Sequence, residues 1–210
     1  SRACTTPNCN VEQRANNIWL IGRNTASNEA SSHTIDFTTG SPIVSVKANA
    51  MDFYESTSVV SDENGNILMY SDGVKIYDAN HTLMAGAPPS LKGPGSSYYG
   101  STQGSLSVGT AKNPDIINFF TTASSDGDNN GLRVHTIDLS KPGNGTVDNL
   151  LGEVVSYDSL LMQNTNEMLT AYGTCNSDST WVISHEKGSS NFIVIFSCFF
   201  IFSRFFLFIL

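Results

Sequence analysis

Hydrophobic and polar residues alternate in short runs along most of this chain, and turn-forming residues separate the runs. The pattern is clearest at 57–81, TSVVSDENGNILMYSDGVKIYDANH, where it predicts three short strands joined by two turns. The first strand is Thr57–Ser61. Asn64-Gly65 is typical of a two-residue type I′ hairpin, because both positions need φ > 0, and Asp72-Gly73 marks the next turn. A meander of this size buries too little apolar surface to be stable alone, so it must pack against similar units.

Strand patterns recur at intervals of about 8–14 residues, which is typical of all-β proteins. The other predicted strands are Asn17–Gly22, His33–Phe37, Ile43–Val46, Ile67–Ser71, Val74–Tyr77, Ser105–Val108, Ile116–Thr122, Leu132–Leu139, Glu153–Tyr157, Met168–Tyr172, Thr180–His185 and Phe192–Phe196. Helical periodicity is weak, and its one candidate, Leu150–Leu161, contains the unfavourable Gly152. Ala85–Gly104 is rich in Gly, Pro and Ser and is predicted to be a structureless functional loop or a linker.

Three stretches, beginning near Val59, Ser107 and Leu169, resemble one another and recur at about the 50–60-residue scale of propeller blades with loop insertions. The sequence therefore predicts an all-β fold, a partial β-propeller of about two and a half blades of antiparallel meanders, in a fragment of a longer protein. Trp19 and Trp181 are expected in the core between blades.

The chain divides into three predicted regions. They are a cysteine-bearing segment at 1–15, an incomplete propeller-like region at 16–194, and an apolar tail at 195–210. The stretch Phe192–Leu210 has about the length of one membrane span. Against an anchor stands Arg204, which would cost ~2–3 kcal/mol at the bilayer centre. The favoured interpretation is that the tail is not native propeller sequence but an artefact or the end of a fragment, since a shifted reading frame produces such strings of Phe, Ile and Leu.

Composition narrows the class of protein. Charged residues make up 14% of the chain, a low share that is typical of secreted, turn-rich β proteins. The net charge of −8 argues against a nucleic-acid partner, because phosphate binding needs a basic surface. Cys4 and Cys9 are close enough for a small disulfide, which would fit an oxidising compartment. A zinc site there would need further ligands nearby, and the sequence has none.

A candidate metal site lies in the loop before Leu132. Asp126, Asp128 and Asn130 match the first half of a calcium-loop pattern, in which alternate oxygen ligands precede a glycine. Ile137 occupies the position of the bidentate Glu, so an ordinary polar hairpin loop is the alternative. The four histidines, His33, His81, His135 and His185, show no ligand spacing, so no cofactor beyond this calcium candidate is expected.

Aromatic residues in or near loops provide a second kind of candidate site. Phe53, Tyr54, Tyr98 and Tyr99 could stack on a sugar or contact a protein partner, or they could cover the core.

Six blocks of sequence occur in a characteristic order between about Asn16 and Val194. They are NIWLIG, IDFTTGSP, SVVSDENGNILMYSDGVKIYDANHTLMAG, GSTQGSL, GLRVHTIDL and TWVISHEKGSSNF. This set resembles the β-propeller-like regions of gliding-motility-associated, type IX secretion-linked bacterial surface proteins. The resemblance implies a secreted or cell-surface propeller in an adhesin-like protein. It does not imply a catalytic residue, because the family pattern marks turns and strands. The chain departs from the pattern at both ends, where the propeller is incomplete and no sorting module follows.

The expected function is a non-catalytic, extracellular recognition or adhesion module. The loops Ala85–Gly104 and Ser124–Gly131 would bind a protein or glycan ligand. The alternative is a secreted carbohydrate-active enzyme or lectin on a propeller scaffold, because paired carboxylates can come from distant strands. A third possibility is a surface protein anchored in the membrane by Phe192–Leu210.

Overall fold

The structure is a computed structural model that describes residues 17–22, 32–46, 49–51, 56–93, 101–109, 113–124, 130–173, 179–199 and 203–209. For residues 179, 197–199 and 203–208 the backbone alone is described. Every regular element within these residues is a strand. The strands are β1 Ile18–Ile21, β2 His33–Asp36, β3 Ile43–Val46, β4 Ser58–Ser61, β5 Ile67–Ser71, β6 Ile76–Asp78, β7 Ser105–Val108, β8 Ile116–Thr121, β9 Leu132–Asp138, β10 Glu153–Met162, β11 Thr170–Gly173, β12 Ser179–His185, β13 Phe192–Phe199 and β14 Ser203–Ile209.

The strands form four antiparallel sheets, β1-β2-β3, β4-β5-β6, β7-β8-β9-β10 and β11-β12-β13-β14. Within each sheet, each strand pairs with the next one in sequence, so every sheet is an up-and-down meander. The predicted all-β class is confirmed. The predicted number of about two and a half blades is lower than the four sheets observed, because β1–β3 form a separate sheet and the tail pairs as β13 and β14.

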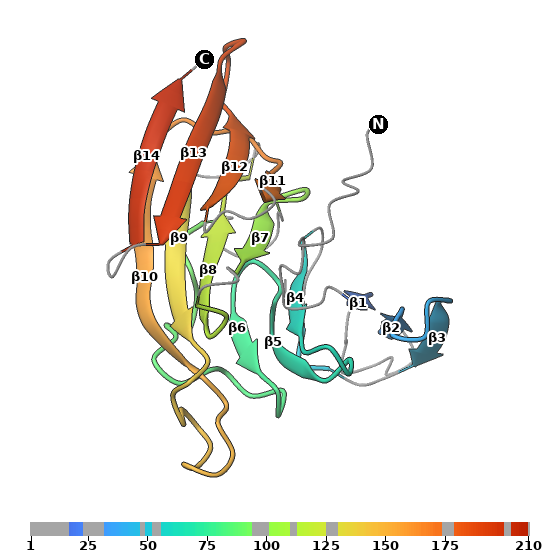
Figure 1. The fold of residues 1–210 in the computed structure, drawn as a ribbon. Helices are drawn as coiled ribbons and strands as arrows, with labels where there is room; N and C mark the ends of the chain where they lie inside the picture. The colour runs from blue at the N-terminus through green and yellow to red at the C-terminus, as the bar shows by residue number, and fades with distance from the viewer. Residues whose placement is uncertain are drawn as a thin grey trace, which may run out of the picture.

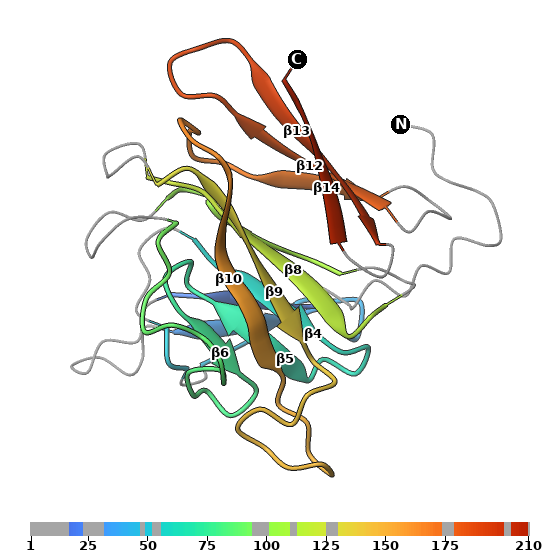
Figure 2. The same ribbon diagram turned by 90° about the vertical axis from the view of Figure 1, so that its left-hand side faces the viewer.

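The four sheets are stacked face to face in sequence order (Figures 1 and 2), and a hydrophobic core fills each of the three interfaces. Neighbouring residues of one strand enter different cores, because successive side chains point to opposite faces of a sheet. In β5, Met69 faces the third sheet and Tyr70 faces the first. In β8, Phe119 faces the second sheet and Phe120 faces the fourth. Both middle sheets are therefore apolar on both faces.

The first strands of successive sheets, β1, β4, β7 and β11, are neighbours in space. Serine hydroxyls join β4 to β7 along these edges. Ser58 Oγ donates to Ser107 Oγ over 2.7 Å and accepts a 2.9 Å hydrogen bond from the backbone N–H of Ser107. Ser56 Oγ donates to Ser105 Oγ in the same way. In each pair the two serines are 49 residues apart in sequence. The contacts therefore join equivalent positions of the similar stretches in the chain.

The first hairpin turn differs from the type I′ turn predicted at Asn64-Gly65. Gly65 has a φ of 81°, but Asn64 does not have a positive φ, and the N–H of Gly65 donates to the carbonyl of Asp62 over 3.2 Å. The Asp62 carboxylate accepts hydrogen bonds from the backbone N–H groups of Asn64 and Asn66, at 2.9 and 2.8 Å. This carboxylate holds the residues between Asp62 and Gly65 in a tight turn. Only Gly65 is then in the left-handed region, as in a three-residue hairpin loop.

The first part of the predicted Ala85–Gly104 loop contains no strand, but it is anchored to the sheets, as is Met84 before it. Met84 and Leu91 donate backbone hydrogen bonds to β6 and to the turn before it, through Ile76 O at 2.9 Å and Val74 O at 2.8 Å. Both of these side chains are buried in the core between the second and third sheets. Residues 83–91 therefore occupy the outer edge of the second sheet, where the third and fourth sheets have another strand.

The two tryptophans lie on the outer faces of the stack, and the prediction that they fill inter-sheet cores is wrong. Trp19 is 53% exposed on the first sheet, although it contacts Phe37 with ring centroids 5.2 Å apart. Trp181 lies on the last sheet, with its ring centroid 4.5 Å from that of Phe196.

The boundary predicted between residues 194 and 195 falls inside β13, and Ile193 and Ile195 on either side of it are buried in one core. β14 then pairs with β13 along its length. Within the described residues we find no helix with the length and hydropathy of a membrane span.

Phe119→Ala and Phe120→Ala test the two-faced packing of the third sheet. Each substitution should lower the free energy of unfolding by about 3–5 kcal/mol, because each removes a buried ring from a different core. Chemical denaturation measures both values, with Val155→Ala, at a half-exposed position of β10, as the control. A near-neutral effect of either phenylalanine substitution would contradict this packing.

Candidate functional site

One end of the stack gathers three segments that are far apart in sequence. They are Ser101–Gly104 before β7, Thr122–Ser124 after β8, and Asn164–Leu169 before β11, and we call them the loop platform. Backbone hydrogen bonds tie two of them together, from Met168 N to Thr102 O at 3.1 Å and from Leu169 N to Gln103 O at 2.9 Å. The platform is therefore a fixed surface formed by the third and fourth sheets.

Buried and partly buried side chains hold the platform segments together. Ser101 is fully buried, and its hydroxyl lies 2.9 Å from Thr122 Oγ1. The Glu167 carboxylate accepts a 3.2 Å hydrogen bond from the backbone N–H of Thr102. Gly104 is required by close packing, because a Cβ at this position would lie 2.0 Å from Ser101 Oγ. Any larger residue at 104 would push the segment away from Ser101.

The platform contains three of the five non-glycine residues with positive φ in the described part of the chain. They are Gln103 at 52°, Asn164 at 55° and Met168 at 74°. Residues in this region cost of order 1–3 kcal/mol and persist only where the surrounding structure imposes them, often at functional sites. All three side chains are exposed. The positive φ values fix the backbone at these positions, and the exposed side chains there are two amides and a thioether.

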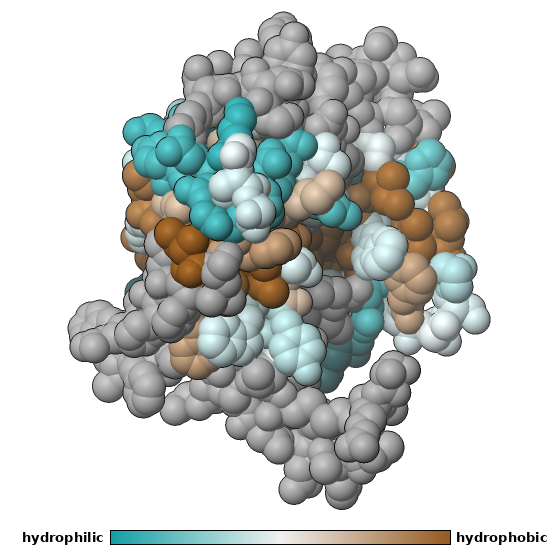
Figure 3. Space-filling view, turned by 90° about the horizontal axis from the view of Figure 1, so that it is seen from above, coloured by the Kyte–Doolittle hydropathy of each residue, from teal (hydrophilic) through white to brown (hydrophobic). Residues whose placement is uncertain are grey.

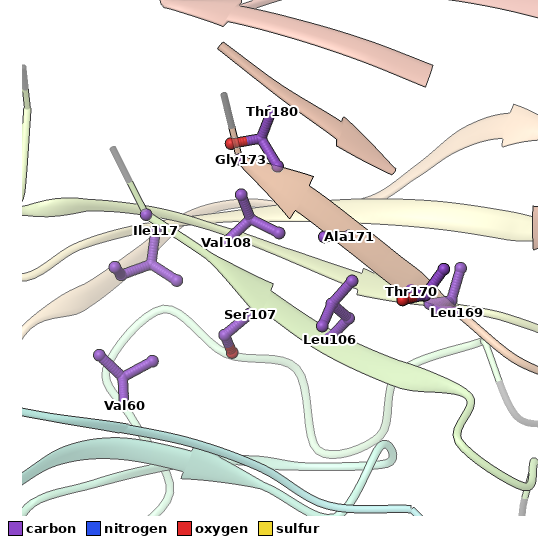
Figure 4. A pocket seen from close by; sticks show the side chains of 11 residues that line it. Val60, Leu106, Ser107, Val108, Ile117, Leu169, Thr170, Ala171, Gly173 and Thr180 are labelled. Atoms are coloured by element: carbon purple, nitrogen blue, oxygen red, sulfur yellow. The ribbon is translucent and has the colours of Figure 1, made fainter. Parts of the chain in front are cut away.

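A groove of about 300 Å³ lies next to the platform, between β7 and β11 (Figure 4). Its walls are mainly small and apolar, including Val108, Leu169 and Ala171, with Val60 of β4 at one side. The described residues that line the groove include no ionisable side chain. These walls can therefore bind an apolar group but provide no acid or base for proton transfer.

Two carboxylates stabilise turns instead of converging on a site. Burial alone would raise the pKa of Asp78, but the hydrogen bonds from Asn144 and Thr82 outweigh it and lower the pKa. Hydrogen bonds from the side chains of Ser189 and Asn191 lower the pKa of Glu186. A general acid for glycoside hydrolysis needs a raised pKa, and neither of these groups has one.

His135 is buried, a feature that the sequence did not distinguish among its four dispersed histidines. Its Nδ1 accepts a 3.0 Å hydrogen bond from the backbone N–H of Asp158, so Nε2 carries the proton and donates to Thr121 Oγ1 at 3.0 Å. Burial, together with the charge of Arg133, lowers the pKa of His135 to about 3. The neutral ring joins β8, β9 and the bulged strand β10, where Asp158 has a φ of 54°.

The predicted site residues are mostly outside the described residues. This holds for Cys4 and Cys9, for Asp126 and Asp128 of the calcium candidate, and for the loop aromatics Phe53, Tyr54, Tyr98 and Tyr99. Asn130 is described, and its carbonyl accepts a 2.8 Å hydrogen bond from Arg133 Nε. Among the described residues, no three His, Cys, Asp or Glu side chains gather as a metal site. Calcium binding and the Cys4–Cys9 disulfide stay predictions.

The platform was missed at the sequence level, except that Ser101–Gly104 and Ser124 lie in loops predicted to bind. No sequence signal marks Gln103 or Met168, because their positive φ values come from the contacts between segments. Comparisons with known protein families, curated proteins and solved structures found no match to this chain.

His135 predicts a pH dependence of stability. Its pKa in the folded protein, about 3, lies below the unfolded value of 6.5, so the unfolded state binds the extra proton between these values. The contribution is complete above pH 6.5 and is lost as the pH falls toward 3, by up to about 1.4 kcal/mol per pH unit. Denaturation at pH 7, 6 and 5 should show this slope, and His135→Gln should flatten it.

The control for this measurement is His185→Gln, at a partly exposed strand end. An NMR titration of the native protein gives a second readout, in which the His135 ring should stay neutral down to pH 4. Protonation of this ring near pH 6.5 would contradict the prediction.

Proposed function

We propose that the four sheets are consecutive blades of a β-propeller and that the protein is a non-catalytic recognition or adhesion module of the cell surface or extracellular space. The arrangement of the first strands supports the propeller. In a propeller, the first strand of each blade lies nearest the axis, and blades pack face to face around it. Here β1, β4, β7 and β11 are neighbours in chain order, and a core fills each interface between successive sheets.

The loop platform is the proposed binding surface, and the observation that carries this assignment is its imposed backbone geometry. Gln103 and Met168 are held with positive φ by hydrogen bonds between two segments that enter adjacent first strands. A rigid platform loses little conformational entropy on binding, which favours recognition of a protein or glycan ligand. Residues 85–93 are left out of the proposed surface, because they are anchored away from the platform, with Leu91 hydrogen-bonded to Val74 and Lys92 hydrogen-bonded to Asp158.

The double variant Gln103→Ala/Met168→Ala tests the proposed surface. The full-length chain is screened for binding to glycans on an array and to intact bacterial cell surfaces. The variant should bind its ligand at least about tenfold more weakly, because it removes a hydrogen-bonding group and an exposed apolar contact from the centre of the surface. Thermal unfolding checks that the fold is kept.

Val147→Ala is the matched control, because Val147 is 82% exposed in the loop between β9 and β10, at the opposite end of the third sheet. Unchanged binding by the double variant would overturn the platform as the binding surface. Hydrolysis of a polysaccharide by the chain, abolished by substitution of one Asp or Glu, would overturn the non-catalytic assignment.

A further inference from the structure

The two outermost sheets each leave one apolar face uncovered within the described structure. We call the outer face of the first sheet the first face; its apolar residues are Trp19, Ile21, Ile35, Val44 and Val46. Strand register places these residues on one side, because Trp19 pairs with Ile35 and Ile35 with Val44. Figure 3 shows hydrophobic residues gathered on the side of the molecule where Figure 1 draws β1–β3. Exposed fractions reach 63% at Val44.

We call the outer face of the fourth sheet the last face; its apolar residues are Tyr172, Trp181, Ile183, Phe192, Val194 and Phe196. Their neighbours along each strand, Val182, Ile193 and Ile195, point the other way into the core with the third sheet. Tyr172 is 66% exposed and Phe192 is 52% exposed. The described side chains of the last face are therefore mainly apolar.

The two uncovered faces are opposite halves of one kind of interface. In each internal interface, the face of one sheet that points toward the carboxyl end of the stack packs on the opposite face of the next sheet. The last face points toward the carboxyl end of the stack, and the first face points toward its amino end. Packing a last face on a first face would therefore repeat the internal interfaces, and this chain carries both of the faces that such a contact needs.

The composition of the two faces suits association between identical chains. The described side chains on them include no Asp, Glu, Lys or Arg, although the whole chain carries a net charge of −8. The register of β14 adds one basic residue, Arg204, at a last-face position opposite Cys198. Aromatic residues are concentrated there, with Trp19 beside Phe37 and Trp181 beside Phe196. Depletion of charge and enrichment of Trp, Tyr and Phe are the features that distinguish the centre of a protein interface. Two acidic chains would meet here without charge repulsion between the contacting residues.

We propose that a second copy of this chain covers both faces, with the last face of each copy packed on the first face of the other. Such head-to-tail contacts form a closed ring when the rotation between copies closes. Two copies of four sheets make about eight blades, within the ~4–8 blades of known propellers. The inference uses the observed stacking of the sheets and does not depend on a ligand of the loop platform.

The test is the oligomeric state of the full-length chain, measured by sedimentation velocity and by light scattering across a dilution series. A species of twice the 22.6 kDa chain mass is expected. Trp19→Asp on the first face and Tyr172→Asp on the last face should each weaken the dimer by about 30-fold or more, because each replaces an aromatic ring of the contact by a charge. Val147→Asp, at an exposed valine outside both faces, should leave the dimer unchanged. Circular dichroism and thermal unfolding check that every variant is folded.

Mixing the two variants distinguishes the head-to-tail contact from a symmetric one. Trp19→Asp keeps an intact last face and Tyr172→Asp keeps an intact first face, so the mixture should form a heterodimer through one intact contact. A dimer that is sensitive to Trp19→Asp alone would mean that two first faces pair, and would overturn the proposal. A folded chain that stays monomeric at millimolar concentration, or one that grows into longer open oligomers, would also overturn it.

Discussion

The fold depends on the opposite orientation of neighbouring side chains in a strand, applied to sheets that are apolar on both faces. In β8, Phe119 and Phe120 enter different cores, so this one strand stabilises two interfaces. A sheet of this kind cannot leave either face in water without exposing large apolar side chains. Each middle sheet therefore needs a neighbour on both sides, and the stack follows from that need.

Acidic side chains stabilise the turns at which several strands end. The carboxylates of Asp62, Asp78 and Glu186 accept hydrogen bonds within the turns, and these bonds keep the groups ionised. Part of the acidic charge of the chain is therefore explained by turn structure and needs no cationic ligand. At the loop platform, Glu167 has a similar supporting role beneath Thr102. The exposed groups of the platform are uncharged.

The sequence identified the strands well because their pattern is local, and β3, β5 and β7 begin and end where alternation predicts. The prediction from sequence failed where contacts between distant residues determine the conformation. Asn64 avoids a positive φ because the Asp62 carboxylate holds the turn, and Leu91 is buried because residues 83–91 follow the edge of the second sheet. The sequence also placed Trp19 and Trp181 in cores between blades, because the pattern of a strand does not show whether a neighbouring sheet covers it. The strained residues of the platform, Gln103 and Met168, carry no sequence signal at all.

Each sheet is made of consecutive strands, and each stacks on the sheet that precedes it in the chain. Most contacts needed to complete a sheet are therefore available as soon as its last strand has emerged from the ribosome. Each finished sheet then offers an apolar surface on which the next can condense, as in proteins whose repeats contact only their neighbours. Assembly can thus proceed vectorially from the amino terminus, with one unfinished sheet at a time.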